Sequence, residues 1–215
     1  MTMEPTDEQQ LAGGLAGTRR RRAQTGTKER MIRAAARILS REGYAGLTME
    51  RVAAESGVAK TTLYRRWPTK AALCMELYLE VAGNELSDPD TGNVGSDLKH
   101  VANAVVRLQT KTVAGPALIG LIAEAQVNPD SRPAFLAEFA ERRREVTRLV
   151  LNRAIERGEL RADTDIDLVI DALGGAVTFR LLQGHAPLTQ EFANALVSLV
   201  LNGCKPGPDE QQETG

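Results

Sequence analysis

The chain has 215 residues, of which 42% are hydrophobic and 26% charged, a composition that suits one or two globular domains. Its longest apolar run, at residues 114–123, is well short of the roughly 18 residues that a membrane span needs, and no signal-peptide pattern precedes it. The two cysteines, Cys74 and Cys204, have no metal-ligand spacing. We therefore expect a cytoplasmic protein with no metal site, disulfide scaffold or cofactor.

The net charge of −1 conceals an uneven distribution. Residues 18–70 contain 14 Lys and Arg against 4 Asp and Glu, whereas residues 71–215 contain 13 basic and 21 acidic side chains. A basic segment joined to an acidic body favours a nucleic-acid-binding module attached to a second domain. The alternative is a solvated basic face.

Residues 1–26 are polar and lack apolar periodicity, which predicts a disordered N-terminal segment. It contains an unbroken basic run of Arg19, Arg20, Arg21 and Arg22. This run could form an arm that enters an adjacent minor groove of DNA, where narrow A·T tracts attract arginine. The alternative is a solubilising tail.

Residues 27–70 read as a compact three-helix domain that leads into a fourth helix. Thr27, Thr48 and Thr69 are candidate helix N-caps, and Gly43 and Gly57 are candidate stops. The helix from about residue 59 to 65 ends before Pro68, and the next continues to about residue 84.

Residues 71–203 also read as helical, and residues 204–215 as a disordered tail. After a loop at 88–95, we expect a helix capped by Ser96, an apolar helix to residue 127, and a long helix at 134–157. Asp165 and Thr189 cap the last two. With about nine helices and no alternating strand pattern, the predicted fold class is all-α.

The segment 48–70 has the features of a helix-turn-helix. Ala53 is small enough for a close helix crossing, and Gly57 permits a left-handed turn. The second helix then exposes groups that can contact base edges or phosphates, namely Lys60, Thr61, Thr62, Tyr64 and Arg65. Thr48 and Lys70 begin neighbouring helices and are placed for backbone contacts. Taken singly, each has an ordinary surface interpretation, and Trp67 suits a hydrophobic anchor better than a base reader.

At residues 48–70, the pattern Thr-x3-Val-Ala-x2-Ser-Gly-Val-x4-Leu-Tyr-x2-Trp-x-Thr-Lys resembles the signature of TetR-family transcriptional regulators. The resemblance covers about residues 27–70, and the later helices are similar to that family only in length and layout. Arg66 departs from the pattern, because many members have His or Tyr there.

The resemblance implies a non-enzymatic, homodimeric repressor that binds a palindromic double-stranded DNA operator and releases it when a small-molecule effector binds. It implies a DNA-facing set consisting of Thr48, Lys60, Thr61, Thr62, Tyr64, Arg65 and Lys70.

The last two helices carry apolar stripes, and the first of them contains Gly174 and Gly175 in its interior. A mid-helix glycine costs about 1 kcal/mol relative to alanine, which favours close packing against another backbone. We therefore expect a four-helix dimer interface, with packing inside one chain as the alternative. The candidate interface residues are Gly174, Gly175, Val177, Phe192, Leu196 and Leu199.

An effector pocket would be lined by apolar residues of the middle helices, although most of these also suit an ordinary core. The candidates are Leu118, Leu121, Ile122, Phe135, Phe139 and Phe179. His100 and His185 are isolated and are expected to be surface or capping residues.

Two other functions remain open at this stage. A DNA-binding protein without an effector, either a constitutive regulator or an architectural protein, is favoured if the second domain has a closed core. An enzyme has little support: the alternating Asp163, Asp165 and Asp167 lie at a predicted helix start, where acids favour the helix dipole.

Overall fold

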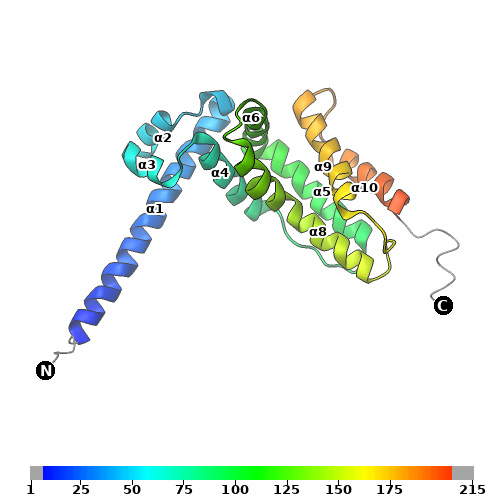
Figure 1. Cartoon of the computed structure of the whole chain (residues 1–215), viewed down its shortest axis with the longest axis horizontal. Helices are drawn as coiled ribbons and strands as arrows, with labels where there is room; N and C mark the ends of the chain where they lie inside the picture. The colour runs from blue at the N-terminus through cyan, green and yellow to red at the C-terminus, as the bar shows by residue number, and fades with distance from the viewer. Residues whose placement is uncertain (1–6, 205–215) are drawn as a thin grey trace. The chain divides into compact units, whose positions relative to one another are not determined.

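The computed structural model describes the backbone of residues 7–204 and, within that range, the side chains of residues 26–137 and 139–203. The described chain is helical and contains no strand, which confirms the all-α prediction (Figure 1). It divides into two compact units, Met1–Leu73 and Cys74–Gly215. We call them the N-terminal and C-terminal units.

The N-terminal unit contains α1 (Asp7–Gly46), α2 (Met49–Ser56) and α3 (Lys60–Arg66), and α4 (Lys70–Glu85) starts in it and continues into the next unit. The other elements of the C-terminal unit are α5 (Val94–Lys111), α6 (Ala114–Val127), α7 (Arg132–Ala134), η1 (Phe135–Ala140), α8 (Glu141–Glu156), α9 (Ile166–Gln183) and α10 (Gln190–Cys204).

Helix α1 begins earlier than the sequence pattern predicts. It starts at Asp7 rather than Thr27, so residues 7–26 are helical instead of disordered. This segment contains Gln, Leu, Ala and Arg, which have high helix propensities, and it has no proline after its start. Residues 1–6 lie outside the described part, as do residues 205–215 of the predicted C-terminal tail.

Three helices share the core of the N-terminal unit. Ile38 of α1, Val52 of α2 and Leu63 of α3 are all fully buried, as the helix-turn-helix interpretation requires. Trp67 is only 3% exposed, which agrees with its predicted role as a hydrophobic anchor. The core therefore fixes α3 from one side and leaves its other side at the surface.

Ion pairs join α1 to α2 at the surface of this core. The guanidinium of Arg51 binds both carboxylate oxygens of Glu42, and its Nη1 also donates to the carbonyl oxygen of Gly46 at 3.1 Å. Arg41 Nη2 binds Glu55 Oε1 at 2.5 Å. These contacts set the position of α2 on α1.

In the C-terminal unit, α5 packs against α6, α8 and α10. Its buried residues Leu98 and Val101 meet Val150 and Leu151 of α8 and Val197 of α10 in one apolar cluster. The predicted apolar spacing of these helices accounts for this core.

Among the helices after α3, three predicted N-caps are confirmed, and that of α5 is different. Thr69, Asp165 and Thr189 accept hydrogen bonds from backbone N–H groups in the first turns of α4, α9 and α10. The cap of α5 is Asn93 rather than Ser96: Asn93 Oδ1 accepts from the N–H of Ser96 at 2.9 Å. Asparagine is at least as good an N-cap as serine, so the helix begins earlier.

The predicted helix at 134–157 is a continuous helical run with a change of winding. It consists of α7, the π-helical segment η1 and α8. Short π-helical segments are often found at functional sites, because the wider turn displaces side chains from regular spacing.

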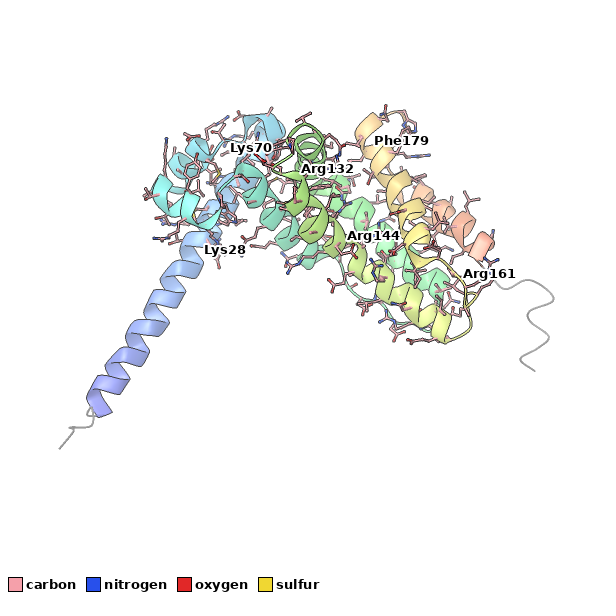
Figure 2. The ribbon with its side chains drawn as sticks, viewed as in Figure 1. Lys28, Lys70, Arg132, Arg144, Arg161 and Phe179 are labelled. Carbon is pink, nitrogen blue, oxygen red and sulfur yellow. The ribbon has the colours of Figure 1, made fainter. Side chains whose placement is uncertain are left out.

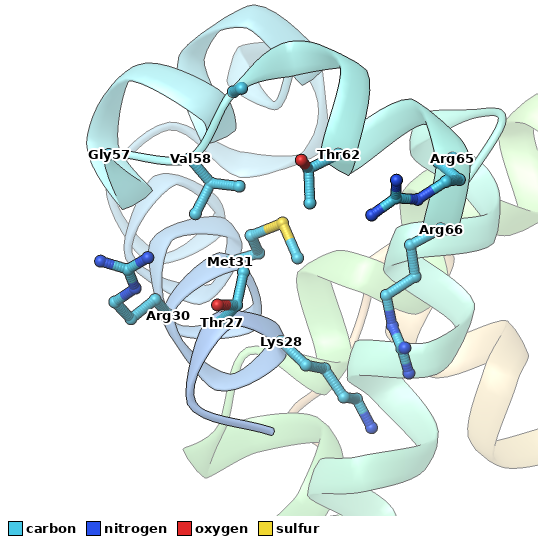
Figure 3. A pocket seen from close by; sticks show the side chains of 10 residues that line it. Thr27, Lys28, Arg30, Met31, Gly57, Val58, Thr62, Arg65 and Arg66 are labelled. Carbon is cyan, nitrogen blue, oxygen red and sulfur yellow. The ribbon is translucent and has the colours of Figure 1, made fainter. Parts of the chain in front are cut away.

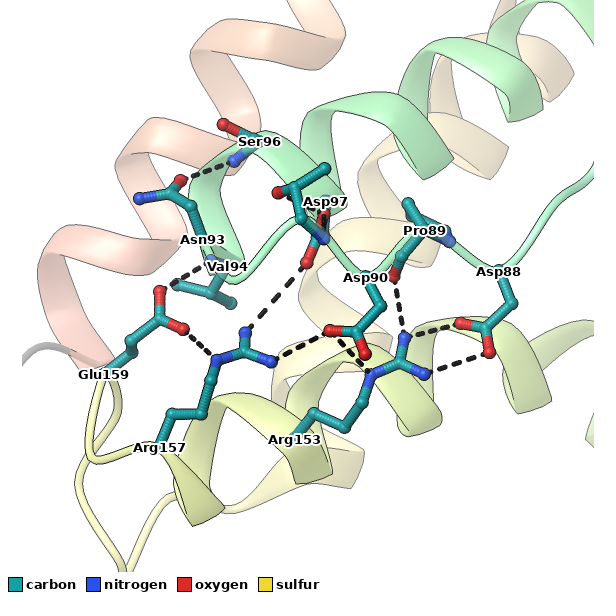
Figure 4. Close-up of polar contacts among 11 residues, drawn as sticks. Asp88, Pro89, Asp90, Asn93, Val94, Ser96, Asp97, Arg153, Arg157 and Glu159 are labelled. Carbon is teal, nitrogen blue, oxygen red and sulfur yellow. Dashed lines mark hydrogen bonds and ion pairs between the residues drawn. The ribbon is translucent and has the colours of Figure 1, made fainter.

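Arg153 of α8 and Arg157, the residue that follows this helix, hold the segment that leads into α5 (Figure 4). Arg153 binds both oxygens of Asp88 at 2.5 and 3.0 Å and the carbonyl oxygen of Pro89 at 2.7 Å. Arg157 binds Glu159 at 2.6 Å, and Glu159 in turn accepts from the backbone N–H of Val94 at 2.6 Å. The loop and the first residue of α5 are thereby attached to the C-terminal end of α8.

Candidate nucleic-acid interface

The turn between α2 and α3 has the geometry predicted for a helix-turn-helix. Thr48 Oγ1 accepts from the backbone N–H of Arg51 at 3.3 Å and caps α2. Gly57 ends α2 in the left-handed conformation, with φ of 65°, and Val58 N donates to Ala53 O at 3.2 Å. Because Val58 is buried directly after this turn, α3 starts in a fixed direction.

Helix α3 presents most of the predicted DNA-contacting side chains at the surface. Lys60, Thr61, Tyr64 and Arg65 are exposed, and Thr62 is half-buried. The buried Leu63 lies on the opposite face. The helix thus has one apolar side in the core and a polar surface with three exposed cationic side chains, Lys60, Arg65 and Arg66.

Thr48 and Lys70 mark the starts of α2 and α4. Thr48 is exposed, although its hydroxyl already accepts the capping hydrogen bond. Lys70 is half-buried, and its ammonium lies 4.3 Å from the centroid of the Tyr44 ring. The electrostatic attraction between the ammonium and the aromatic ring restricts this side chain.

A carboxylate that the sequence analysis did not select lies beside α3. Glu50, in the first turn of α2, accepts a hydrogen bond from Tyr64 Oη at 3.3 Å and lies 3.6 Å from Lys60 Nζ. The pKa of Glu50 is lowered, first by its own backbone N–H and then by Lys60 and Tyr64, while burial and Glu50 raise the pKa of Tyr64. No periodicity marks such a contact, because it depends on how α2 and α3 cross.

A basic cavity of about 630 Å³ opens between residues 27–31 of α1 and helix α3 (Figure 3). Met31 and Val58 supply apolar lining, and Arg65 and Arg66 lie on one side of Met31 with Arg30 on the other. The complete lining is Thr27, Lys28, Arg30, Met31, Gly57, Val58, Ala59, Thr62, Arg65 and Arg66. It contains four cationic side chains and no acid, so it suits an anionic group such as a phosphate.

Three of these cations, Lys28, Arg30 and Arg66, were not in the predicted DNA-contacting set. The excess of basic residues at 18–70 was the available signal, but only the fold brings them to the side of α3. The guanidinium of Arg66 also lies 5.1 Å from the centroid of the Trp67 ring. The side chains of the predicted arm, Arg19, Arg20, Arg21 and Arg22, lie outside the described part.

The predicted pocket residues divide into a buried group and an exposed one. Leu118, Leu121 and Phe139 are at most 2% exposed, whereas Ile122 and Phe135 are half-buried. Phe179 is 59% exposed on α9 and is not part of a closed pocket (Figure 2).

Around Phe139 the C-terminal unit forms an aromatic and polar cluster. The ring of Tyr78, on α4, meets Phe139 edge-on at 4.9 Å between centroids, and Phe135 follows at 5.4 Å. Gln109 Nε2 donates to Tyr78 Oη at 2.8 Å, and Gln109 Oε1 is buried without a hydrogen-bond partner among the described residues. The guanidinium of Arg143 lies 5.7 Å from the Phe139 ring centroid. A buried amide beside aromatic rings can recognise both the polar and the apolar parts of a small molecule.

The outer faces of α9 and α10 expose several large apolar side chains. Leu199 is 72% exposed, Leu168 65% and Phe179 59%. Gly174 and Gly175 are exposed, and a Cβ at either would meet nothing within 4 Å of the same chain. Among the other predicted interface residues, Val177 is buried within the chain, and Phe192 and Leu196 are half-buried.

The described side chains include no group of three or more His, Cys, Asp or Glu that could hold a metal ion. In the same part of the chain, no helix combines the length and apolarity that a membrane span requires.

Comparison with known proteins assigns both units. Residues 31–77 match the family described as "Bacterial regulatory proteins, tetR family", and residues 88–200 match "Tetracyclin repressor-like, C-terminal domain". The chain belongs to the TetR family. A TetR-family member is a DNA-binding transcriptional regulator and not an enzyme, which confirms both predictions.

Similar TetR-family relatives span most of the chain. An HTH-type transcriptional regulator of Mycobacterium tuberculosis, Rv1556, is 30% identical over 77% of this chain and 81% of its own length. The DNA-binding transcriptional repressor TetR of Mycobacteroides abscessus is 30% identical over 80% of this chain and 90% of its own. The crystal structure of the TetR-family regulator SCO0332 is 38% identical, with a TM-score of 0.72 over 84% of this chain and 99% of that one.

The three aspartates that were considered for an enzyme site have structural contacts instead. Asp165 caps α9, and Asp163 lies 3.2 Å from the Arg161 guanidinium. Asp167 accepts from Arg144 Nη2 at 2.9 Å and joins α9 to α8.

Proposed function

We propose that this TetR-family regulator is a homodimeric repressor that binds a palindromic operator through α3 and releases it when a small molecule binds the C-terminal unit. The observation that carries the DNA-binding part is the exposed polar face of α3 opposite the buried Leu63. A repressor is favoured over an activator because the Mycobacteroides abscessus relative is named a transcriptional repressor. Such a protein acts on DNA in the cytoplasm.

The proposed DNA contacts fall into two classes. The side chains of α3, namely Lys60, Thr61, Thr62, Tyr64 and Arg65, enter the major groove and read base edges. Thr48, Lys70 and the cations of the basic cavity contact the phosphate backbone on either side. The arginine run at 19–22 adds a minor-groove arm.

The proposed dimer forms through the outer faces of α9 and α10. Exposed large apolar side chains on two adjacent helices are costly in water, and an isologous contact with a second copy covers them. Gly174 and Gly175 allow close approach of the partner helix, because nothing in the same chain fills the space where a Cβ would be. A two-fold dimer presents two copies of α3 to half-sites about 34–36 Å apart, or a multiple of that spacing.

The proposed effector site is the cluster of Tyr78, Gln109, Phe135 and Phe139. Its unpaired amide oxygen and the π-helical segment η1 support this choice. Tyr78 lies on α4, the helix that begins at Lys70 beside the DNA-binding domain. A ligand that displaces Tyr78 can therefore change the position of α4 and weaken operator binding.

The proposed operator binding can be tested by selection: the full-length protein is used to select bound duplexes from a random or genomic DNA pool. Enrichment of one near-palindromic sequence supports the proposal, and enrichment of no sequence contradicts it. Screening small molecules for release of that operator at fixed salt tests the second part. A constitutive regulator would bind the same operator, and no ligand of the C-terminal unit would change its affinity.

A further inference from the structure

A carboxylate contacts two of the proposed reading residues of α3. Glu50 lies in the first turn of α2, and its Oε1 is 3.3 Å from Tyr64 Oη and 3.6 Å from Lys60 Nζ. Lys60 and Tyr64 are four residues apart on α3, so they lie on the same face of that helix. Glu50 therefore holds the two side chains together from outside α3.

We propose that Glu50 is a specificity-determining residue: it positions Lys60 and Tyr64, disfavours binding to arbitrary DNA, and accepts a hydrogen bond from a cytosine amino group in the operator. This inference rests on the proposed role of α3 in reading DNA. It adds a discriminating group that composition and helix pattern do not indicate.

Positioning follows from the geometry. The side chains of Lys60 and Glu50 are 59% and 54% exposed, and Tyr64 is 42% exposed, so none of the three is fixed by burial. Without Glu50, the long lysine side chain would sample many rotamers before meeting DNA. Restricting it in advance lowers the entropy lost on binding a matching site.

Discrimination against arbitrary DNA follows from charge. Non-specific binding depends almost entirely on cations that neutralise phosphates. While Lys60 is paired with Glu50, it contributes less to that term, and the carboxylate itself is repelled by nearby phosphates. Both effects weaken binding to any sequence that offers Glu50 no hydrogen-bond donor.

Cytosine is the base whose chemistry suits this position. A carboxylate offers about four acceptor positions. Tyr64 and Lys60 both contact Oε1 of Glu50, which leaves acceptor capacity for a further donor. In the major groove, the amino group of cytosine is the usual donor to Glu and Asp.

The test compares full-length wild type with Glu50→Gln, which removes the charge, and with Glu50→Asp, which keeps the charge but withdraws it from Lys60 and Tyr64. Affinities for the selected operator and for a random duplex of equal length are measured at several salt concentrations. Glu156→Gln, an exposed change of equal charge on α8 of the other unit, is the matched control. Thermal unfolding establishes that each variant is folded.

For Glu50→Gln, we expect tighter binding to random DNA, a salt slope steeper by about 0.9, and an operator-to-random ratio lowered about tenfold. Glu50→Asp should also lower the ratio, and Glu156→Gln should leave it at the wild-type value. A repeated selection with Glu50→Ala should lose preference for cytosine at one position of each half-site.

An unchanged ratio and salt slope in Glu50→Gln would overturn this inference while leaving the DNA-binding proposal intact. An equal decrease in the operator-to-random affinity ratio for Glu156→Gln would also overturn the inference, because the decrease would then result from net charge alone. If the wild type itself selects no operator, the proposed function fails and this inference fails with it.

Discussion

Tyr78 and Gln109 form a buried hydrogen bond of 2.8 Å that joins α4 to α5 inside the C-terminal unit. It lies beside Phe139, against which the Tyr78 ring packs edge-on. Any event that separates Tyr78 from Gln109 changes the support of α4, the helix that also begins in the N-terminal unit.

Tyr78→Phe should destabilise the C-terminal unit, because it leaves the Gln109 amide with neither of its polar ends paired among the described residues. The expected cost is about 1–3 kcal/mol, the usual penalty for a buried polar group that loses its partner. Chemical denaturation measures this loss. Gln109→Leu in the Tyr78→Phe background should recover part of the lost stability. If it does not, the loss of stability does not come from the Tyr78–Gln109 hydrogen bond.

Lys60→Ala and Tyr64→Ala should weaken operator binding while leaving the dimer intact. A residue that reads a base contributes about 1–3 kcal/mol, and loss of one phosphate contact lowers the salt slope by about one. Fluorescence anisotropy with a labelled operator measures both quantities, and sedimentation tests the dimer. Operator affinity equal to that of the wild type in both variants would reject α3 as the recognition helix.

Leu199→Glu should dissociate the dimer without unfolding the chain, because this side chain is 72% exposed in the single subunit. A charge at the centre of an apolar interface would have to be desolvated without a partner. Val127→Glu on α6 is the matched control, since Val127 is 81% exposed but lies outside α9 and α10. Sedimentation equilibrium should show monomers only for Leu199→Glu. Dimers in both variants would place the interface elsewhere.

The N-terminal unit should lose stability as the pH falls below about 4.5. The hydrogen-bonded guanidinium of Arg51 lowers the pKa of Glu42, and that of Arg41 lowers the pKa of Glu55. Both folded-state values lie below the ordinary glutamate pKa of about 4.5, so the stabilisation is complete above that pH and is lost as the pH falls through the folded-state values.

Thermal unfolding between pH 7 and pH 3 measures this loss. Glu42→Gln should show a lower melting temperature at pH 7 and a smaller decrease on acidification, because it cannot gain a proton. Glu156→Gln should follow the wild-type curve. If the melting temperatures of Glu42→Gln and the wild type fall in parallel with pH, the lowered pKa of Glu42 does not contribute to stability.

Deleting residues 1–22 should reduce operator affinity and flatten its salt dependence, because the run Arg19, Arg20, Arg21 and Arg22 is removed. A matched variant with these four arginines changed to glutamine keeps the segment length. If either variant keeps the salt slope of the full chain, the arm interpretation fails.

The fold of this protein was largely predictable from local patterns. Thr48, Gly57 and Leu63 each combine a residue preference with a fixed spacing, and the structure uses them as cap, left-handed turn and core contact. The all-α class and the starts at Asp165 and Thr189 follow from the same kind of signal.

The features that the sequence analysis did not predict depend on contacts between different helices. Lys28 and Arg66 line one cavity only because α1 and α3 pack together, and Glu50 meets Tyr64 only because α2 crosses α3 at one angle. Phe179 was proposed as a pocket residue because it is apolar, but apolarity alone does not predict that its side chain is 59% exposed on α9.

Helix α3 has seven residues and α2 has eight. Helices of fewer than about 12 residues are marginal in water when isolated, so the shape of the reading surface exists only while Leu63 and Trp67 remain packed. Warming should therefore abolish sequence recognition in a single cooperative step, at the melting temperature of the N-terminal unit. Heat would thus remove sequence recognition through the loss of one small core.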